Sequence, residues 1–161
     1  MASKDGQDPR IARIKSAIRV IPNFPKQGNM FQDITTLLLD TKAFKDTIDL
    51  FVERYIDKNI TVVAGLEAKG FIFGSPIALA LGAKFVPMRK HNKLPGAVQP
   101  GARAIVIDDQ IVTGGSLYAA FKLLERAGVH VVECACVIEF PELKGREKLG
   151  DKSLFALINA S

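Results

Sequence analysis

Short apolar runs and helix-periodic segments alternate along the chain from residue 61 onward. The apolar runs are typical of buried strands, whereas the segments between them carry apolar side chains at the three- and four-residue spacing of a helix. Near-continuous apolar strands separated by helices predict an α/β fold, in which a mostly parallel sheet is flanked by helices on both faces. The predicted strands are 61–66, 84–88, 103–107, 129–138 and 153–157, and the predicted helices are 70–81 and 116–127.

The first sixty residues follow a different pattern, with two predicted helices and an irregular segment between them. Asp8 precedes a proline, which is a helix-start signal, and isoleucines at helical spacing extend the predicted helix over residues 9–18. A second amphipathic helix is predicted over residues 41–57. Residues 21–28 contain two prolines and a glycine, which predicts an ordered loop held in place by Phe24.

Length and composition indicate one globular domain spanning residues 1–161, with residues 1–8 flexible. The sequence contains no secretory signal and no apolar run of membrane-spanning length, so a cytoplasmic location without membrane attachment is the default expectation. Cys134 and Cys136 lie two residues apart in a predicted strand and therefore share a face. We interpret them as buried thiols of a reducing compartment, because a zinc site that used His130 would still lack a fourth ligand.

The net charge of +5 is concentrated in residues 88–93, directly after a predicted strand. Nucleic-acid-binding surfaces usually carry a wider basic stripe with interleaved aromatic side chains, and this chain has no Trp and only two Tyr. A compact basic cluster at a strand end better fits a small polyanion such as pyrophosphate. The alternative interpretation is a solvated charged loop.

The most informative motif runs from the predicted strand 103–107 into the predicted helix 116–127. Asp108 and Asp109 follow the strand, and a Thr-Gly-Gly-Ser turn precedes the helix. A glycine-rich turn at a helix N-terminus offers unpaired N–H groups to a phosphate, and two carboxylates can accept hydrogen bonds from the hydroxyls of a sugar. The motif therefore predicts a ribose 5-phosphate site, although a plain surface turn is the alternative.

Three special segments fall at the carboxyl ends of predicted strands. They are residues 67–70, residues 89–93 and residues 108–116. In parallel sheets ligands bind beyond these strand ends, so the three segments are expected to converge on one site.

Two consecutive acids followed by Thr-Gly-Gly-Ser resemble the phosphoribosyl pyrophosphate motif of type I phosphoribosyltransferases. Matching segments elsewhere resemble the adenine phosphoribosyltransferase family in particular, and they extend in order from about residue 18 to the C-terminus. The resemblance implies the type I phosphoribosyltransferase fold. The most specific matches are Lys93-Leu94-Pro95-Gly96 and the segment Leu-Lys-Gly-Arg-Glu-Lys-Leu at 143–149.

The resemblance implies a purine-salvage reaction, in which adenine and phosphoribosyl pyrophosphate give AMP and pyrophosphate. The implied cofactor is Mg²⁺, bound mainly through the substrate and water, with no direct protein ligand expected. The implied partners are the two small-molecule substrates and a second copy of the chain in a homodimer, with no nucleic acid.

The site residues follow from the resemblance, position by position. Asp108, Asp109 and Lys69 are implied to be catalytic, and residues 143–149 are implied to close the outer side of the pocket. For Met30 and Phe31, ordinary core packing is the alternative. The implied contacts are, for the 5-phosphate, Val112, Thr113, Gly114, Gly115 and Ser116; for the pyrophosphate, Glu67, Ala68, Gly70, Arg89, Lys90 and Lys93; and for adenine, Met30, Phe31 and Gln32.

The chain departs from the family pattern most clearly between Gly96 and Ala97. Family members carry here a hood of about twenty residues that excludes water and handles a proton on the purine, so its absence predicts reduced turnover. Lys69 replaces an Arg that could make a planar two-pronged contact. Val112 replaces a smaller residue, and Gln110 replaces an apolar one.

Functions of different classes remain open at this point. One is an adenine phosphoribosyltransferase of reduced activity, and the other is a non-catalytic paralogue that binds AMP or phosphoribosyl pyrophosphate as a regulator or dimer partner. A nucleic-acid-binding regulator would require a separate basic face, which the sequence does not contain. The missing hood also has two explanations, a true deletion or a loop omitted from the sequence.

Overall fold

The structure is a computed structural model that describes residues 8–24, 27, 30–89 and 98–160. It divides into two compact units, Met1–Leu50 and Phe51–Ser161. The single domain expected from the sequence therefore stays a prediction, and the flexibility expected for residues 1–8 concerns mostly residues outside the described part.

The first unit contains two helices, a two-stranded ribbon and the beginning of a third helix. α1 (Pro9–Ala17) begins as predicted, since the Asp8 carboxylate accepts a hydrogen bond from the backbone N–H of Arg10 at 2.9 Å. The remaining elements are β1 (Arg19–Pro22), β2 (Met30–Asp33), α2 (Thr35–Leu39) and α3 (Thr41–Tyr55), which continues into the second unit. Of these, α3 was predicted, and it begins after Asp40, whose carboxylate accepts from the N–H of Ala43 at 3.0 Å.

The prediction of an irregular loop over residues 21–28 is partly wrong. Ile21 and Pro22 belong to β1, which pairs antiparallel with β2, and Pro22 lies opposite Met30 at the end of the ribbon. A proline is tolerated at the end of an edge strand, where its missing N–H breaks no ladder hydrogen bond. Phe24 is 50% exposed, so burial of its ring does not hold the turn.

The second unit is built on a five-stranded sheet in the order β4-β3-β5-β6-β7, with all neighbours parallel. Its helices and strands match the predicted alternation closely, which confirms the α/β fold with a parallel sheet. They are β3 (Val62–Leu66), α4 (Lys69–Leu81), β4 (Lys84–Met88), β5 (Arg103–Ile111), α5 (Gly115–Arg126), β6 (His130–Glu139) and β7 (Leu154–Asn159).

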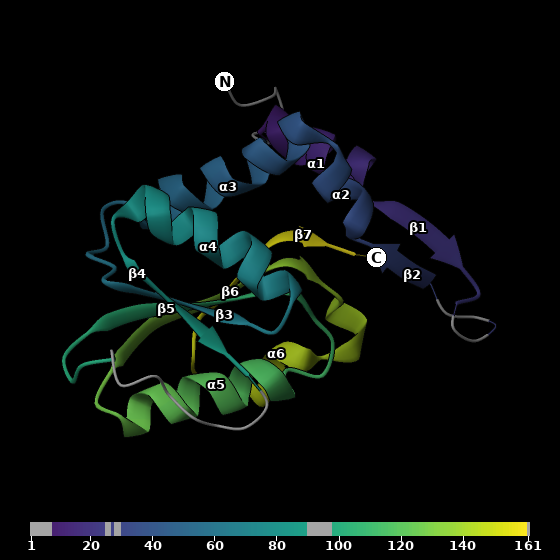
Figure 1. Cartoon of the computed structure of the whole chain (residues 1–161). Coiled ribbons are helices and arrows are strands. Elements are labelled where there is room, and N and C mark those ends of the chain that lie inside the picture. The colour runs from purple at the N-terminus through teal and green to yellow at the C-terminus, as the bar shows by residue number, and fades with distance from the viewer. Residues whose placement is uncertain (1–7, 25–26, 28–29, 90–97, 161) are drawn as a thin grey trace. The chain divides into compact units, whose positions relative to one another are not determined.

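Helices α4 and α5 cover opposite faces of this sheet (Figure 1). Alternate side chains of the strands, such as Ala64 and Val106, pack in one buried cluster with Leu117 and Leu124 of α5. On the other face, α4 approaches β3 through glycines: a Cβ on Gly65 would lie 2.7 Å from the carbonyl oxygen of Gly70 and 2.8 Å from the Phe85 ring. None of the described helices is long and apolar enough to cross a membrane.

Strand β5 is four residues longer than predicted. Asp108, Gln110 and Ile111 continue the ladder with β6, opposite Cys136, Ile138 and Glu139 respectively. The two acids therefore lie within the strand rather than in the loop after it, because pairing with a long neighbour outweighs their low strand propensity. The sequence also gave no sign of the short helices η1 (Pro141–Leu143) and α6 (Gly145–Lys148).

A buried carboxylate links α3, β6 and β7 within the second unit. Glu133 accepts hydrogen bonds from the Arg54 guanidinium at 2.7 and 3.0 Å, from the Tyr55 hydroxyl at 2.7 Å and from the Ser153 hydroxyl at 2.5 Å. The Arg54 guanidinium also lies 3.9 Å from the centre of the Phe155 ring. Burial by itself would raise the pKa of Glu133, but the hydrogen bonds from Arg54, Ser153 and Tyr55 outweigh it and lower the pKa to about 2.

We predict that Glu133→Gln makes the free energy of unfolding depend less on pH in the acidic range. A carboxylate whose pKa is lowered by folding stabilises the protein above its unfolded pKa, and this contribution disappears as the pH falls from about 4.5 toward 2. The variant should lose about 2–3 kcal/mol at pH 7 and much less near pH 2. Urea unfolding across this pH range measures the difference, and an equal loss at both pH values would contradict the assignment.

Candidate active site

The candidate site lies where the order of the sheet reverses. β3 is followed along the chain by β4 on one side, whereas β5 and β6 lie on its other side. The pairing of β3 with β5 ends at Gly65 and Ile107, so the last four residues of β5 pair only with β6. The edge of Asp108–Ile111 that faces away from β6 has no strand partner in the described chain, and ligands of open α/β sheets bind at such a crevice.

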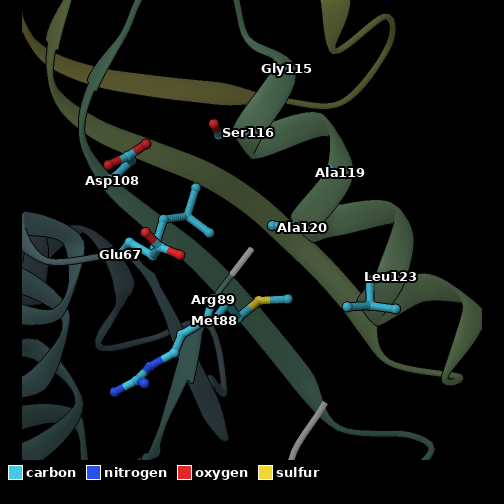
Figure 2. Close-up of a pocket in the computed structure, with 10 residues that line it drawn as sticks. Glu67, Met88, Arg89, Asp108, Gly115, Ser116, Ala119, Ala120 and Leu123 are labelled. Atoms are coloured by element: carbon cyan, nitrogen blue, oxygen red, sulfur yellow. The ribbon is translucent and has the colours of Figure 1, made fainter. Parts of the chain in front are cut away.

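A cavity of about 370 Å³ opens at the carboxyl ends of β3, β4 and β5. We call it the main cavity. Glu67, Asp108 and Ser116 surround one end of it, and Met88 and Leu123 lie at the other end (Figure 2). Arg89 also lines the cavity, although its guanidinium extends away from Ser116. Among the described residues, two of the three segments expected to converge thus meet directly, and the third reaches the cavity through Arg89.

A smaller cavity of about 150 Å³ lies beside the start of α5. It is lined by Val112, Thr113, Gly114 and Ser116, four of the five residues assigned to the 5-phosphate; the fifth, Gly115, lines the main cavity. We call residues 112–116 the phosphate loop. Gly114 precedes α5 with a φ of 83°, a conformation that favours glycine, and the helix behind it has twelve residues. The loop therefore directs first-turn N–H groups and the positive end of the helix dipole toward an anion.

The two acids of the motif are neighbours with different surroundings. Asp108 lines both cavities, whereas the Asp109 carboxylate lies 3.9 Å from the Lys69 ammonium and is 13% exposed. The Asp108 carboxylate accepts a hydrogen bond from the Asp109 backbone N–H at 2.8 Å. Burial, followed by hydrogen bonding to the Asp109 carboxyl and its negative charge, raises the pKa of Asp108 well above its usual range. In its neutral form Asp108 can donate a hydrogen bond, and both carboxyls can accept hydrogen bonds from hydroxyls.

The junction of β3 and α4 is tightly constrained. Ala68 has a φ of 56° and a ψ of −89°, a conformation that is costly for a residue with a Cβ. Gly70 is buried, and a Cβ there would lie 2.9 Å from the carbonyl oxygen of Ile107. Close packing of α4 on β5 thus leaves no room for a side chain at Gly70, and Glu67, directly before the strained residue, lines the main cavity. Ala68, Lys69 and Gly70 do not line either cavity, and their contacts with pyrophosphate stay a prediction.

Several predicted residues lie outside the described part of the structure. They are Lys90 and Lys93, the position between Gly96 and Ala97, and the side chains of Met30 and Phe31. Gln32 is described, on β2 of the first unit. The assignment of the adenine pocket therefore stays a prediction.

The sequence analysis missed the apolar wall of the main cavity, formed by Leu66, Met88, Ala119, Ala120 and Leu123. The residues of this wall that lie on α5 could have been predicted from their spacing in the sequence. Counted from Ser116, the residues three, four and seven positions later share one face of a helix, so the hydroxyl and the apolar wall had to point the same way.

Residues 143–149, expected to close the outer side of the pocket, contact the phosphate loop through Gly145 and Lys148 and line neither of the two cavities. A Cβ on Gly145 would lie 2.5 Å from the carbonyl oxygen of Val112. The Arg146 guanidinium binds the Glu139 carboxylate at 2.6 and 3.0 Å, so its charge has the structural role that was expected.

Comparison with known proteins gives consistent matches. Residues 35–161 match the model of the phosphoribosyl transferase domain. Adenine phosphoribosyltransferase 4 of Arabidopsis thaliana is 62% identical, with 98% of each chain covered. The solved structure of adenine phosphoribosyltransferase from Saccharomyces cerevisiae, complexed with an imino-altritol bisphosphate and adenine, is 36% identical with a TM-score of 0.85, covering 92% of this chain and 98% of that one. The chain belongs to the adenine phosphoribosyltransferase family.

A third relative bears on the missing hood of this adenine phosphoribosyltransferase family member. Adenine phosphoribosyltransferase 1, chloroplastic, of Arabidopsis thaliana is 65% identical over 182 aligned residues, which cover 100% of this chain and 75% of the relative. Because this chain has 161 residues, at least 21 aligned positions have no counterpart in it. This number is close to the length of about twenty residues expected for a hood between Gly96 and Ala97.

We predict that Asp109→Asn lowers the pKa of Asp108 part of the way toward that of an exposed carboxyl. The substitution removes the neighbouring negative charge but leaves the burial of Asp108 unchanged. Titration of the carboxyl carbon of Asp108 by NMR measures the shift. Asp151→Asn is the matched control, since Asp151 is exposed and precedes β7 at the opposite end of the sheet. An unchanged Asp108 titration in Asp109→Asn would contradict the coupling of the two acids.

Proposed function

We propose that this member of the adenine phosphoribosyltransferase family transfers the phosphoribosyl group of phosphoribosyl pyrophosphate to adenine, giving AMP and pyrophosphate, within a single catalytic domain. The observation that carries the proposal is the meeting of an acid pair and a glycine-rich helix N-terminus on adjoining cavities at the switch point of the sheet. Among phosphate-binding arrangements, this one combines an anion site with acceptors for sugar hydroxyls.

The phosphate loop binds the 5-phosphate through the N–H groups of residues 113–116 and the hydroxyls of Thr113 and Ser116. Asp108 and Asp109 hold the ribose hydroxyls. The Asp108 carboxyl lines both cavities, so a sugar bound there spans from the phosphate loop to the main cavity. Its raised pKa allows Asp108 to donate as well as accept a hydrogen bond, which suits a pair of hydroxyls.

The pyrophosphate lies toward Glu67 and Arg89, at the strand ends that border the main cavity. Mg²⁺ fits this region, because Glu67 and Asp108 line the main cavity and carboxylate oxygens are ligands that Mg²⁺ prefers. The proposal has the ion held mainly by substrate oxygens and water. When bound, Mg²⁺ neutralises charge on the departing pyrophosphate.

Catalysis by this site relies on position and charge rather than on a covalent intermediate. The bond between ribose C1 and pyrophosphate breaks with positive charge building on the sugar, and the N9 atom of adenine forms the new bond. Asp108 and Asp109 fix the ring, and the Asp109 carboxylate, 3.9 Å from the Lys69 ammonium, stabilises the positive charge on the sugar. Adenine is assigned to Met30, Phe31 and Gln32.

The proposal includes reduced turnover, because the hood that would exclude water and handle the purine proton is missing. General acid–base assistance alone is typically worth about 10²–10⁴-fold in rate. A homodimer and a cytoplasmic location belong to the same proposal, supported by the family resemblance and by the sequence respectively.

The test is AMP formation from adenine and phosphoribosyl pyrophosphate with Mg²⁺. We expect measurable turnover, lower than that of a hood-bearing relative by about 10²–10⁴-fold. Asp109→Ala is the control, and it should abolish ribose 5-phosphate binding without altering the circular dichroism spectrum. Calorimetry with ribose 5-phosphate and AMP accompanies the assay. Intact binding without any turnover would reject the enzyme in favour of a non-catalytic binding paralogue.

A graft of a family hood between Gly96 and Ala97 should raise kcat by about tenfold or more, because it restores water exclusion and proton handling. The matched control is a polar linker of the same length at the same position. Equal rates for both insertions would show that the Lys69 and Val112 replacements limit turnover instead. Lys69→Arg and Val112→Ala in the grafted chain then measure the share of each.

A further inference from the structure

We infer that Gly145 and Arg146 are positioning residues for phosphate binding, because they hold α6 against the back of the phosphate loop and so fix the direction of its N–H groups. The inference rests on the proposed function, since it concerns how the same loop binds the 5-phosphate. Neither residue lines either of the two cavities. Their effect on a ligand must therefore pass through the loop.

The first observation is a backbone contact between two glycines. A Cβ added to Gly114 would collide with the carbonyl oxygen of Gly145 and lie 3.0 Å from the Cβ of Lys148. In the other direction, a Cβ on Gly145 would lie 2.5 Å from the carbonyl oxygen of Val112 and 3.0 Å from the Cγ1 of Ile111. In both directions the nearest atom is a main-chain carbonyl oxygen, which cannot move aside as the end of a flexible side chain can.

The second observation is the attachment of α6 to the sheet. Arg146 donates two hydrogen bonds to the Glu139 carboxylate, at 2.6 and 3.0 Å, and a third to the carbonyl oxygen of Leu154 at 2.8 Å. Glu139 ends β6, lies opposite Ile111 of β5 and is only 8% exposed at its side chain. A planar guanidinium with three fixed acceptors sets both the height and the angle of α6 relative to the strand ends.

The third observation links α6 to the helix that follows the phosphate loop. The Lys148 ammonium lies 4.8 Å from the centre of the Tyr118 ring, and the Tyr118 N–H donates to the carbonyl oxygen of Gly114 at 2.9 Å. α6 thus contacts the loop at Gly114 and contacts α5 one turn later. A displacement of α6 would change the angle between the loop and the helix N-terminus.

Such a displacement matters because anion binding by backbone N–H groups depends on their direction. A misplacement of about 1 Å at a preorganised site can reduce activity by about 100-fold. With a Cβ at Gly145, the Val112 carbonyl has to move by several tenths of an ångström, since contacts below about 3 Å are not tolerated. The phosphate loop begins at this residue and moves with it.

The experiment compares Gly145→Ala and Arg146→Lys with the wild-type chain. Calorimetry with ribose 5-phosphate gives the affinity, steady-state kinetics give KM for phosphoribosyl pyrophosphate and kcat, and NMR gives the amide shifts of Gly114 and Gly115 without ligand. We expect both variants to weaken ribose 5-phosphate binding, Gly145→Ala by about tenfold or more. KM should rise much more than kcat falls, and the two glycine amides should shift before any ligand is added.

The control is Gly150→Ala, which lies just after α6 and has a φ of 61° but no atom within 4 Å of the added Cβ. It introduces backbone strain without contact to the loop, so it should lower the melting temperature while leaving affinity and the amide shifts of Gly114 and Gly115 unchanged. If Gly145→Ala does not fold, the inference is tested by Arg146→Lys alone. This variant keeps the positive charge but loses the fixed geometry of the guanidinium hydrogen bonds.

The inference is overturned if the wild-type chain binds ribose 5-phosphate and the folded variants bind it equally well. It is also overturned if Gly150→Ala weakens binding as much as they do, since that would indicate a general loss of stability. A wild-type chain that fails to bind ribose 5-phosphate overturns the proposed function, and the inference with it.

Discussion

The unequal pairing of β5 is the constraint on which the site depends. Its first half is held between β3 and β6, whereas residues from Asp108 onward are held by β6 alone. One edge of the strand is thereby kept straight and buried, and the other is exposed to the crevice beside β3. Two acids can be fixed there within regular structure, so their carboxyl positions are set by a ladder and not by a loop.

Main-chain contact without side chains is a recurring solution around this crevice. Gly65 and Gly70 let β3 and α4 approach within a distance that a Cβ would prevent, and Gly114 and Gly145 do the same for the phosphate loop and α6. Glycine costs conformational entropy in regular structure, which must be compensated by packing elsewhere. These close contacts hold in place the two segments that would bind a polyanion, the junction of β3 with α4 and the phosphate loop, as preorganised sites require.

The sequence predicted the sheet of the second unit well because its strands are short, apolar and separated by amphipathic helices. It failed where tertiary contacts override local signals. The end of β5 contains two acids, and only pairing with β6 keeps it extended; Pro22 looked like a loop residue, although a ribbon end accepts it. The acid pair and the phosphate loop carried a recognisable motif, whereas the apolar wall on α5 and the support from α6 depend on packing that no short motif encodes.

Strand β6 carries both cysteines of the chain, and both are fully buried between its neighbours β5 and β7. Burial raises the pKa of both thiols, so almost no thiolate exists in the folded protein at neutral pH. A thiol-specific dye can therefore react only after the middle of the sheet has opened. The rate of labelling therefore reports how often the sheet opens around β6, and no additional probe has to be introduced.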